Sequence, residues 1–140
     1  MARANKTRDT VLAQKRGVCV AVIPFVEADV LVDGSVYVNL PEEVMIMSVT
    51  SQITTASGTA SSTLDITFKG VVLVNEMAVS SADITSETLV AAARYSATGG
   101  ELVAKAGAVT PADGALVGTL IVEYIELEKT SGEYTKFLDS

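Results

Sequence analysis

The sequence predicts an all-β domain, a β-sandwich or barrel of about seven to nine strands with an extended basic N-terminal arm. The 140 residues are 49% apolar, which is enough to build the core of one ordinary domain. Twenty valines and fifteen threonines supply β-branched side chains that suit a pleated sheet. Short alternating segments recur at a spacing of about ten residues between turn signals, as in sandwiches and barrels.

The first predicted strand runs from Gly17 to Ala28, a nearly continuous apolar segment. Such a segment is typical of a strand buried on both faces. Pro24 lacks an N–H group, so it requires either an edge position or a bulge.

A hairpin is predicted next, because two alternating runs flank the pair Asp33-Gly34. Asp-Gly adopts the positive φ angles of a type I′ turn at low cost. The runs consist of Val30 and Val32 before the turn, and Val36, Val38 and Leu40 after it. Pro41 ends the second run.

Two further strands follow on either side of a loop of small and hydroxylated residues, 54–63. The first covers 45–53, and its alternation places Met45 and Met47 in the core as gap-filling side chains. The second contains Leu64, Ile66 and Phe68, with Asp65, Thr67 and Lys69 on a solvated face. Gly70 then permits a bend or bulge before the apolar run 71–74.

The middle of the chain allows two interpretations. Ser81 and Asp83 are candidate N-caps, and 86–93 fits a short helix; an extended conformation is nearly as compatible. The turn 98–100 then leads into a strand that contains Leu102 and Ala104, followed by a glycine-containing loop over 106–118.

The last predicted strand covers 119–127, with Leu120, Val122 and Tyr124 on one face. The charged tail 126–140 follows it, with Ser131-Gly132 as a turn and with Tyr134 and Phe137 as candidate docking residues. No domain boundary is expected within 17–140.

Charge divides the chain into two parts. Residues 1–16 carry five basic side chains and one acidic, a net charge of +4, while the remaining 124 carry five basic and sixteen acidic, a net charge of −11. We call residues 1–16 the basic arm and expect it to become ordered only against a partner. Its candidate partner-binding residues are Arg3, Lys6, Arg8, Val11, Leu12, Lys15 and Arg16.

Several classes of function are disfavoured by what the chain lacks. It contains no histidine and no tryptophan, which removes Ser-His and Cys-His nucleophile systems and most transition-metal sites. The glycines fit no nucleotide-binding loop. We therefore expect neither an enzyme nor a cofactor, and we interpret the single Cys19 as a small buried hydrophobic residue.

Carboxylates are the remaining candidate ligands, for calcium. Asp29 with Asp33 forms one such set, and Glu123, Glu126 and Glu128 form another. Neither matches a calcium-binding loop, so we expect no metal and interpret the glutamates as charges that protect a sheet edge.

We do not expect nucleic acid as a partner, because the arm has no interleaved aromatic residues and the body is acidic. The polar start has no apolar segment of the kind that a secretory signal requires. The longest apolar run, 18–26, is far shorter than the roughly 20 residues of a membrane span.

Four stretches resemble small β-rich virion proteins of tailed bacteriophages. They are Tyr37-Val-Asn-Leu-Pro41, Gly70-Val-Val-Leu-Val-Asn-Glu-Met-Ala-Val79, Tyr95-Ser-Ala-Thr-Gly-Gly100 and Gly118-Thr-Leu-Ile-Val-Glu-Tyr-Ile-Glu-Leu127. The resemblance extends over about 17–135 and contains no diagnostic motif.

The resemblance implies a virion structural protein, first of all a capsid decoration (cement) protein, assembled in the host cytoplasm. Such proteins combine a β body, a terminal arm on the capsid lattice and symmetric association, with a trimer favoured. The expected partners are therefore capsid or other virion proteins and further copies of the chain. Alternatives are a neck, tail or head-fibre-anchoring subunit and, more remotely, a carbohydrate-binding β module, which the scarcity of aromatic residues disfavours.

Overall fold

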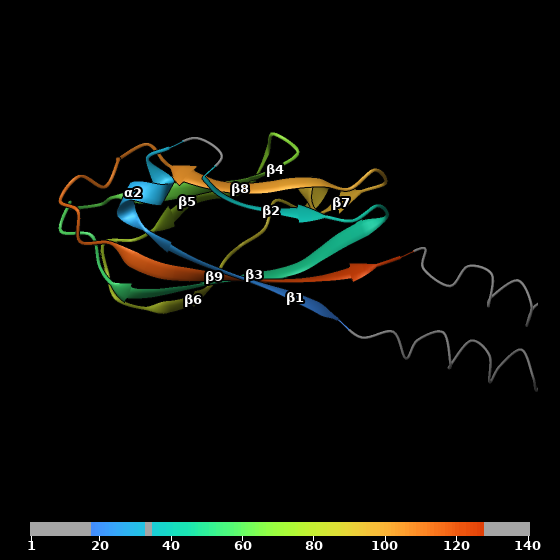
Figure 1. Ribbon diagram of the computed structural model, residues 1–140, viewed down its shortest axis with the longest axis horizontal. Coiled ribbons are helices and arrows are strands. Elements are labelled where there is room, and N and C mark those ends of the chain that lie inside the picture. Colours follow the sequence, from blue (N-terminus) through green and yellow to red (C-terminus); the bar gives the residue numbers. More distant parts are fainter. Residues whose placement is uncertain (1–17, 33–34, 128–140) are drawn as a thin grey trace, which may run out of the picture.

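The protein folds as a β-sandwich of two antiparallel sheets, which confirms the predicted fold class (Figure 1). The structure is a computed structural model and describes residues 18–32 and 35–127. The basic arm and residues 128–140 lie outside the described residues, as do Asp33 and Gly34.

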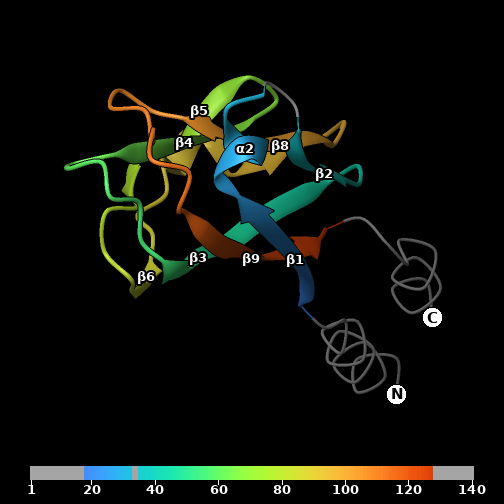
Figure 2. The same cartoon turned by 60° about the vertical axis from the view of Figure 1, so that its left-hand side comes forward.

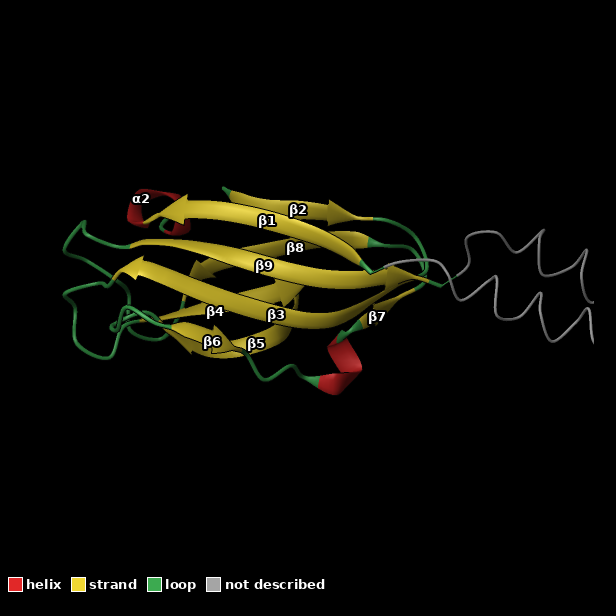
Figure 3. Ribbon diagram, turned by 90° about the horizontal axis from the view of Figure 1, so that it is seen from below, coloured by secondary structure: helices red, strands yellow, loops and turns green. Residues whose placement is uncertain are grey.

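The first sheet contains five strands in the order β1-β9-β3-β6, with β7 also paired to β3. Figure 3 shows the three long strands of this sheet side by side. Their bounds are β1 Cys19–Val26, β3 Val44–Thr55 and β9 Val117–Glu126; the short strands are β6 Ile84–Ser86 and β7 Tyr95–Ser96.

The second sheet contains four strands in the order β2-β8-β4-β5. Their bounds are β2 Val36–Leu40, β8 Gly100–Ala106, β4 Thr63–Phe68 and β5 Val71–Ala78. Lys69 and Gly70, at φ 53° and 77°, form the two-residue turn between β4 and β5. This turn is tighter than the bend that the sequence predicts, and glycine at its second position relieves the steric cost of positive φ.

The core lies between the two sheets and consists of side chains from alternate positions of the facing strands. Ile46, Val49, Leu120 and Val122 of the first sheet are fully buried, together with Leu64, Ile66, Leu73 and Leu102 of the second. The predicted inward faces of β4, β8 and β9 are thus confirmed.

The predicted hairpin around Asp33-Gly34 is wrong. Val30 ends a one-turn helix, α2 (Glu27–Val30), and β2 pairs with β8 instead of with a preceding strand. Figure 2 shows α2 at the point where the chain leaves β1 for the other sheet. Val30 is buried in the core, and the Val26 N–H donates to Asp29 Oδ2 at 3.0 Å. Local alternation identifies the apolar residues here, but packing between the sheets decides their partners.

The prediction for Met45 and Met47 is also wrong. A register shift lies between Ile46 and Ser48, so the inward positions change from Val44 and Ile46 to Val49 and Ile53. Such a bulge moves the side chains that follow it to the opposite face of the sheet. Met47 is consequently exposed, and Met45 is half-buried.

Of the two interpretations of the middle of the chain, the helix over 86–93 is absent, and the start of the segment is extended. Ile84–Ser86 is a strand paired with β3, and only Ala91–Ala93 form a single 3₁₀ turn. The Glu87 N–H donates to the Val49 carbonyl at 2.8 Å. The segment is extended because the edge of β3 offers its backbone hydrogen-bond partners, whereas a short isolated helix is only marginally stable.

Truncation of a core side chain tests this arrangement. We expect Ile66→Ala to reduce the free energy of unfolding by about 2–5 kcal/mol, because Ile66 is fully buried and its removal leaves a cavity. Ile84→Ala is the control, with a change within about 0.5 kcal/mol, since this side chain is 70% exposed. Urea denaturation measures both, and equal losses would contradict the assigned core.

Candidate interaction surface

The strand β1 forms one edge of the first sheet and, among the described strands, pairs with β9 alone. Its outward side chains are apolar and exposed: 54% of Val20 and 62% of Val22 are accessible to solvent. We call Val18, Val20, Val22 and Val26 the valine ridge. The prediction that this segment is buried on both faces is therefore wrong, whereas the edge position, one of the two alternatives that Pro24 left open, is confirmed.

Inward side chains hold β1 against the rest of the sandwich. Phe25 is buried and pairs with Gly118 of β9, where a Cβ atom would lie 2.8 Å from its ring. Glycine thus lets the aromatic ring pack directly over the neighbouring strand. Ala21 and Ile23 also pack against the core. Because these alternate residues anchor the strand, the valine ridge is free for contact without any change of fold.

The ridge extends onto β9, the neighbouring strand. Val22 lies opposite Ile121 and Val26 opposite Val117, which is 39% exposed. At the start of β1, Cys19 lies opposite Tyr124. Burial, followed by the neighbouring Cys19 and Glu126, raises the pKa of Tyr124, so its hydroxyl stays neutral at ordinary pH.

The eight residues of β1 carry no charge, in contrast to the rest of the body. Residues 18–127 contain three basic side chains and thirteen acidic ones, a net charge of −10. The uncharged edge continues directly from the basic arm, with only Gly17 and Val18 between Arg16 and Cys19. An apolar edge next to a basic segment on an acidic body is therefore the principal chemical asymmetry of the chain.

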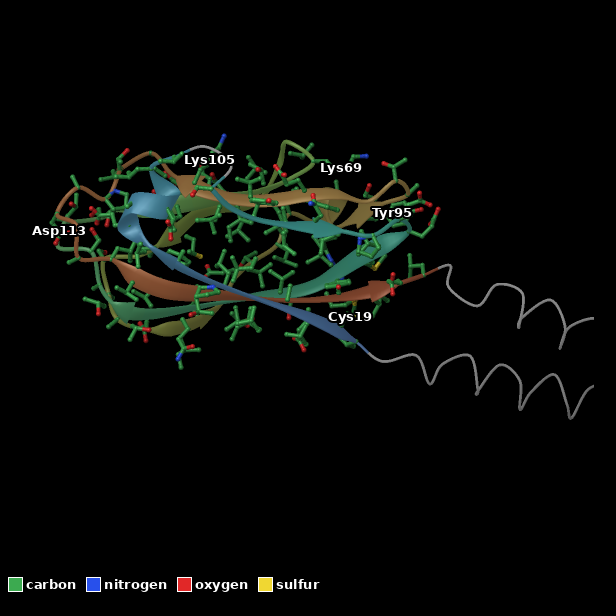
Figure 4. The ribbon with its side chains drawn as sticks, in the orientation of Figure 1. Cys19, Lys69, Tyr95, Lys105 and Asp113 are labelled. Atoms are coloured by element: carbon green, nitrogen blue, oxygen red, sulfur yellow. The ribbon has the colours of Figure 1, made fainter. Side chains whose placement is uncertain are left out.

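Two carboxylates meet at the end of the sandwich where β1 passes into α2. Glu27 is buried and accepts a hydrogen bond from the Gly114 N–H through Oε2, while Oε1 has no hydrogen-bond partner among the described residues. The exposed Asp113 accepts from the Gly58 N–H at 2.7 Å. The pair thus holds α2, the 56–62 loop and the 107–116 loop together. Figure 4 places Asp113 at the end of the molecule opposite Cys19.

Hydrogen bonding sets the charge state of Asp113. Loss of hydration is the largest single influence and raises its pKa, but the N–H groups of Gly58 and Ala115 and the Glu27 side chain together outweigh it. The pKa of Asp113 therefore lies below its ordinary value of 3.8.

The calcium alternatives gain no support from the geometry. Over 18–32 and 35–127, no three acidic or cysteine side chains gather closely enough to hold a metal ion. Glu123 instead accepts a hydrogen bond from the Ser48 hydroxyl across the pair β3 and β9. Asp33 and Glu128 lie outside the described residues.

A shallow depression of about 440 Å³ lies between β3 and the start of β6. Gln52, Ile53, Thr54, Ala82, Asp83 and Ile84 line it, so Asp83 supplies its single ionisable side chain. One carboxylate without a second acid or base does not form an acid–base pair.

All of the sequence-predicted site residues, namely Arg3, Lys6, Arg8, Val11, Leu12, Lys15 and Arg16, lie outside the described residues. The structure adds the valine ridge, which sequence reasoning assigned to the interior. Pro24 was the signal for an edge strand, because proline is tolerated at an edge. No helix in the described part of the chain combines the length and apolar character needed to cross a membrane.

Comparison with known proteins identifies no relative of this chain. The chain matches no family model, and no curated protein or solved structure is significantly similar to it.

The Asp113 contacts generate a prediction about acid stability. A group whose pKa is lower in the folded state contributes stability above its unfolded pKa, and that contribution is lost as pH falls through the folded value. We expect Asp113→Asn to lower the melting temperature at pH 7 and to reduce the further decrease as pH falls below about 3.8. Thermal unfolding from pH 7 to acid measures this. Asp65→Asn serves as the comparison. Asp65 is also a carboxylate in an exposed contact, and it accepts a hydrogen bond from the Glu76 N–H. An unchanged acid profile in Asp113→Asn would contradict the assigned contacts.

Proposed function

We propose that this chain is a non-enzymatic structural protein of a bacteriophage virion, a capsid decoration (cement) protein that acts in many copies. The observation that carries the proposal is the uncharged, exposed edge strand β1 placed directly after the basic arm on a body of net charge −10. Docking to an extended surface uses both features, since apolar contact supplies affinity and charge supplies orientation.

The virion setting is supported by the four stretches that resemble β-rich phage proteins. They fall on β2, on β5, on β7 with its following turn, and on β9. Two of these elements, β5 and β9, are long strands of the sandwich. Association of several copies, with the trimer that the resemblance favours, belongs to the same proposal.

The physical basis of the proposed role is multivalency. A single arm with five cations binds weakly and with strong dependence on salt. On a repeated lattice, each further contact of an oligomer is intramolecular, so avidity rises by orders of magnitude without a new kind of contact. The head is then stabilised because each oligomer links several capsid subunits.

Removal of the arm tests the proposal. We expect the full chain to cosediment in lattice-like copy number with empty heads of its parent phage, and we expect a chain lacking residues 1–16 to lose this binding. Triple reversal of Arg3, Lys6 and Arg8 to Glu should reduce bound copies about tenfold or more, because it replaces attraction with repulsion. Arg3→Lys with Arg8→Lys preserves the charge and is the matched control.

Two outcomes would overturn the decoration role. A chain that ignores heads at low and physiological salt refutes it. Binding of only a few copies per head supports a neck, tail or fibre-anchoring subunit instead. Circular dichroism of each variant shows whether the β body is intact.

A further inference from the structure

The edge of β1 differs from the edges formed by β6, β7 and β5, and it is longer than the remaining edge strand, β2, which has five residues. The opposite edge of the first sheet is covered by β6 and β7, which are only three and two residues long. In the second sheet, the edge strand β5 carries Glu76 at φ 54° and pairs with β4 through two register shifts. Short strands, charges and bulges are devices that prevent one sheet from pairing with another. The eight uncharged residues of β1 have none of these except Pro24.

An edge strand of this kind leaves backbone donors and acceptors available to a further strand. On the outer face beside it, the valine ridge offers apolar contact to the same partner. We propose that a second copy of this chain binds here, with its own β1 antiparallel to the first around a two-fold axis. The inference rests on the association of copies in the proposed function and deepens it by naming one contact, a two-fold contact in place of the trimer that the resemblance favours.

Self-complementarity favours a second copy as the occupant. In a two-fold interface the same patch serves both partners, so an uncharged apolar strand meets an identical uncharged apolar strand. Two bodies of net charge −10 repel each other over most of their surfaces. The eight residues of β1 themselves bring no carboxylate to such a contact.

The two-fold axis sets the antiparallel direction, and charge complementarity supports a second copy as the partner. In this arrangement, the start of one β1 lies beside the end of the other, where the partner's α2 and 107–116 loop lie. That end carries Asp29 and the exposed Asp113. Lys15 and Arg16 precede β1 by only a few residues in the sequence, and their positive charge is attracted to the acidic body of a second copy. A parallel arrangement would have no two-fold axis across the edge.

The size of the contact sets its expected strength. Eight residues of strand extend about 27 Å, and a strip roughly 10 Å wide covers about 270 Å² per copy. A standard interface covers about 800 Å² per partner, so the strand edge by itself supports a weak dimer. We therefore expect a dimer that forms reversibly in the micromolar range and that Lys15 and Arg16 strengthen.

The test is the mass of the full chain in solution without heads. Sedimentation equilibrium from about 1 to about 200 µM, a range suited to a weak interface, should show a mass that rises toward twice 14.6 kDa. Val22→Lys should raise the dimer dissociation constant about tenfold or more, since it places like charges near the two-fold axis. Ile84→Lys is the matched control, because Ile84 is 70% exposed on the opposite edge of the same sheet.

A second pair of variants tests the contact without adding charge. Val22→Cys in a Cys19→Ser background should form an intermolecular disulfide on mild oxidation, because Val22 lies at the middle of β1. Ile84→Cys in the same background should not. Lys15→Glu with Arg16→Glu should weaken the dimer, and the unaltered dimer should weaken as salt is raised.

Each contrary result has a definite meaning. A monomer at the highest concentration, or equal effects of Val22→Lys and Ile84→Lys, overturns the inference. A trimer overturns the two-fold arrangement but agrees with the association that the proposed function includes. Head binding is measured separately, so loss of head binding by a chain that still dimerises refutes the decoration role alone.

Discussion

The architecture depends on β9, the strand that lies between β1 and β3 in the first sheet. One face of β9 supplies the fully buried Leu120 and Val122 to the core, and both of its edges carry antiparallel ladders. Its residue Gly118 admits the ring of Phe25, which anchors β1. Without this strand, β1 would have no hydrogen-bond partner in the sheet, and the valine ridge would have no fixed position.

The passage from β1 to β2 is the second constraint, because it carries the chain from one sheet to the other. The short α2 turns the chain, and Val30 enters the core at that point. Buried Glu27 links α2 to Gly114, while Asp113 links the same loop to Gly58. Polar contacts thus organise one end of the sandwich, where the long loops gather and sheet pairing has ended.

The acidic surface of the body and the uncharged, exposed edge of β1 differ in a way that suits assembly. The acidic side chains discourage contact over most of the body, while the β1 edge is free of charge. A protein that must bind its own copies and a larger surface without aggregating needs such a restriction. The proposed head binding and the inferred two-fold contact use adjacent parts of the chain, the arm and the strand that continues it.

The sequence by itself determined the fold class and most of the strands, because alternation with a period of two records which side chains of β4, β8 and β9 face the core. It also determined the separation of charge between arm and body. Tertiary structure decided the partners: Val30 lies in α2 whereas Val36 lies in a strand of the second sheet, a bulge turned Met47 outward, and no described segment covers the outward face of β1. Composition marks a residue as apolar, but its burial depends on which distant segments pack against it. The valine ridge could therefore not be distinguished from core until the order of the strands was known.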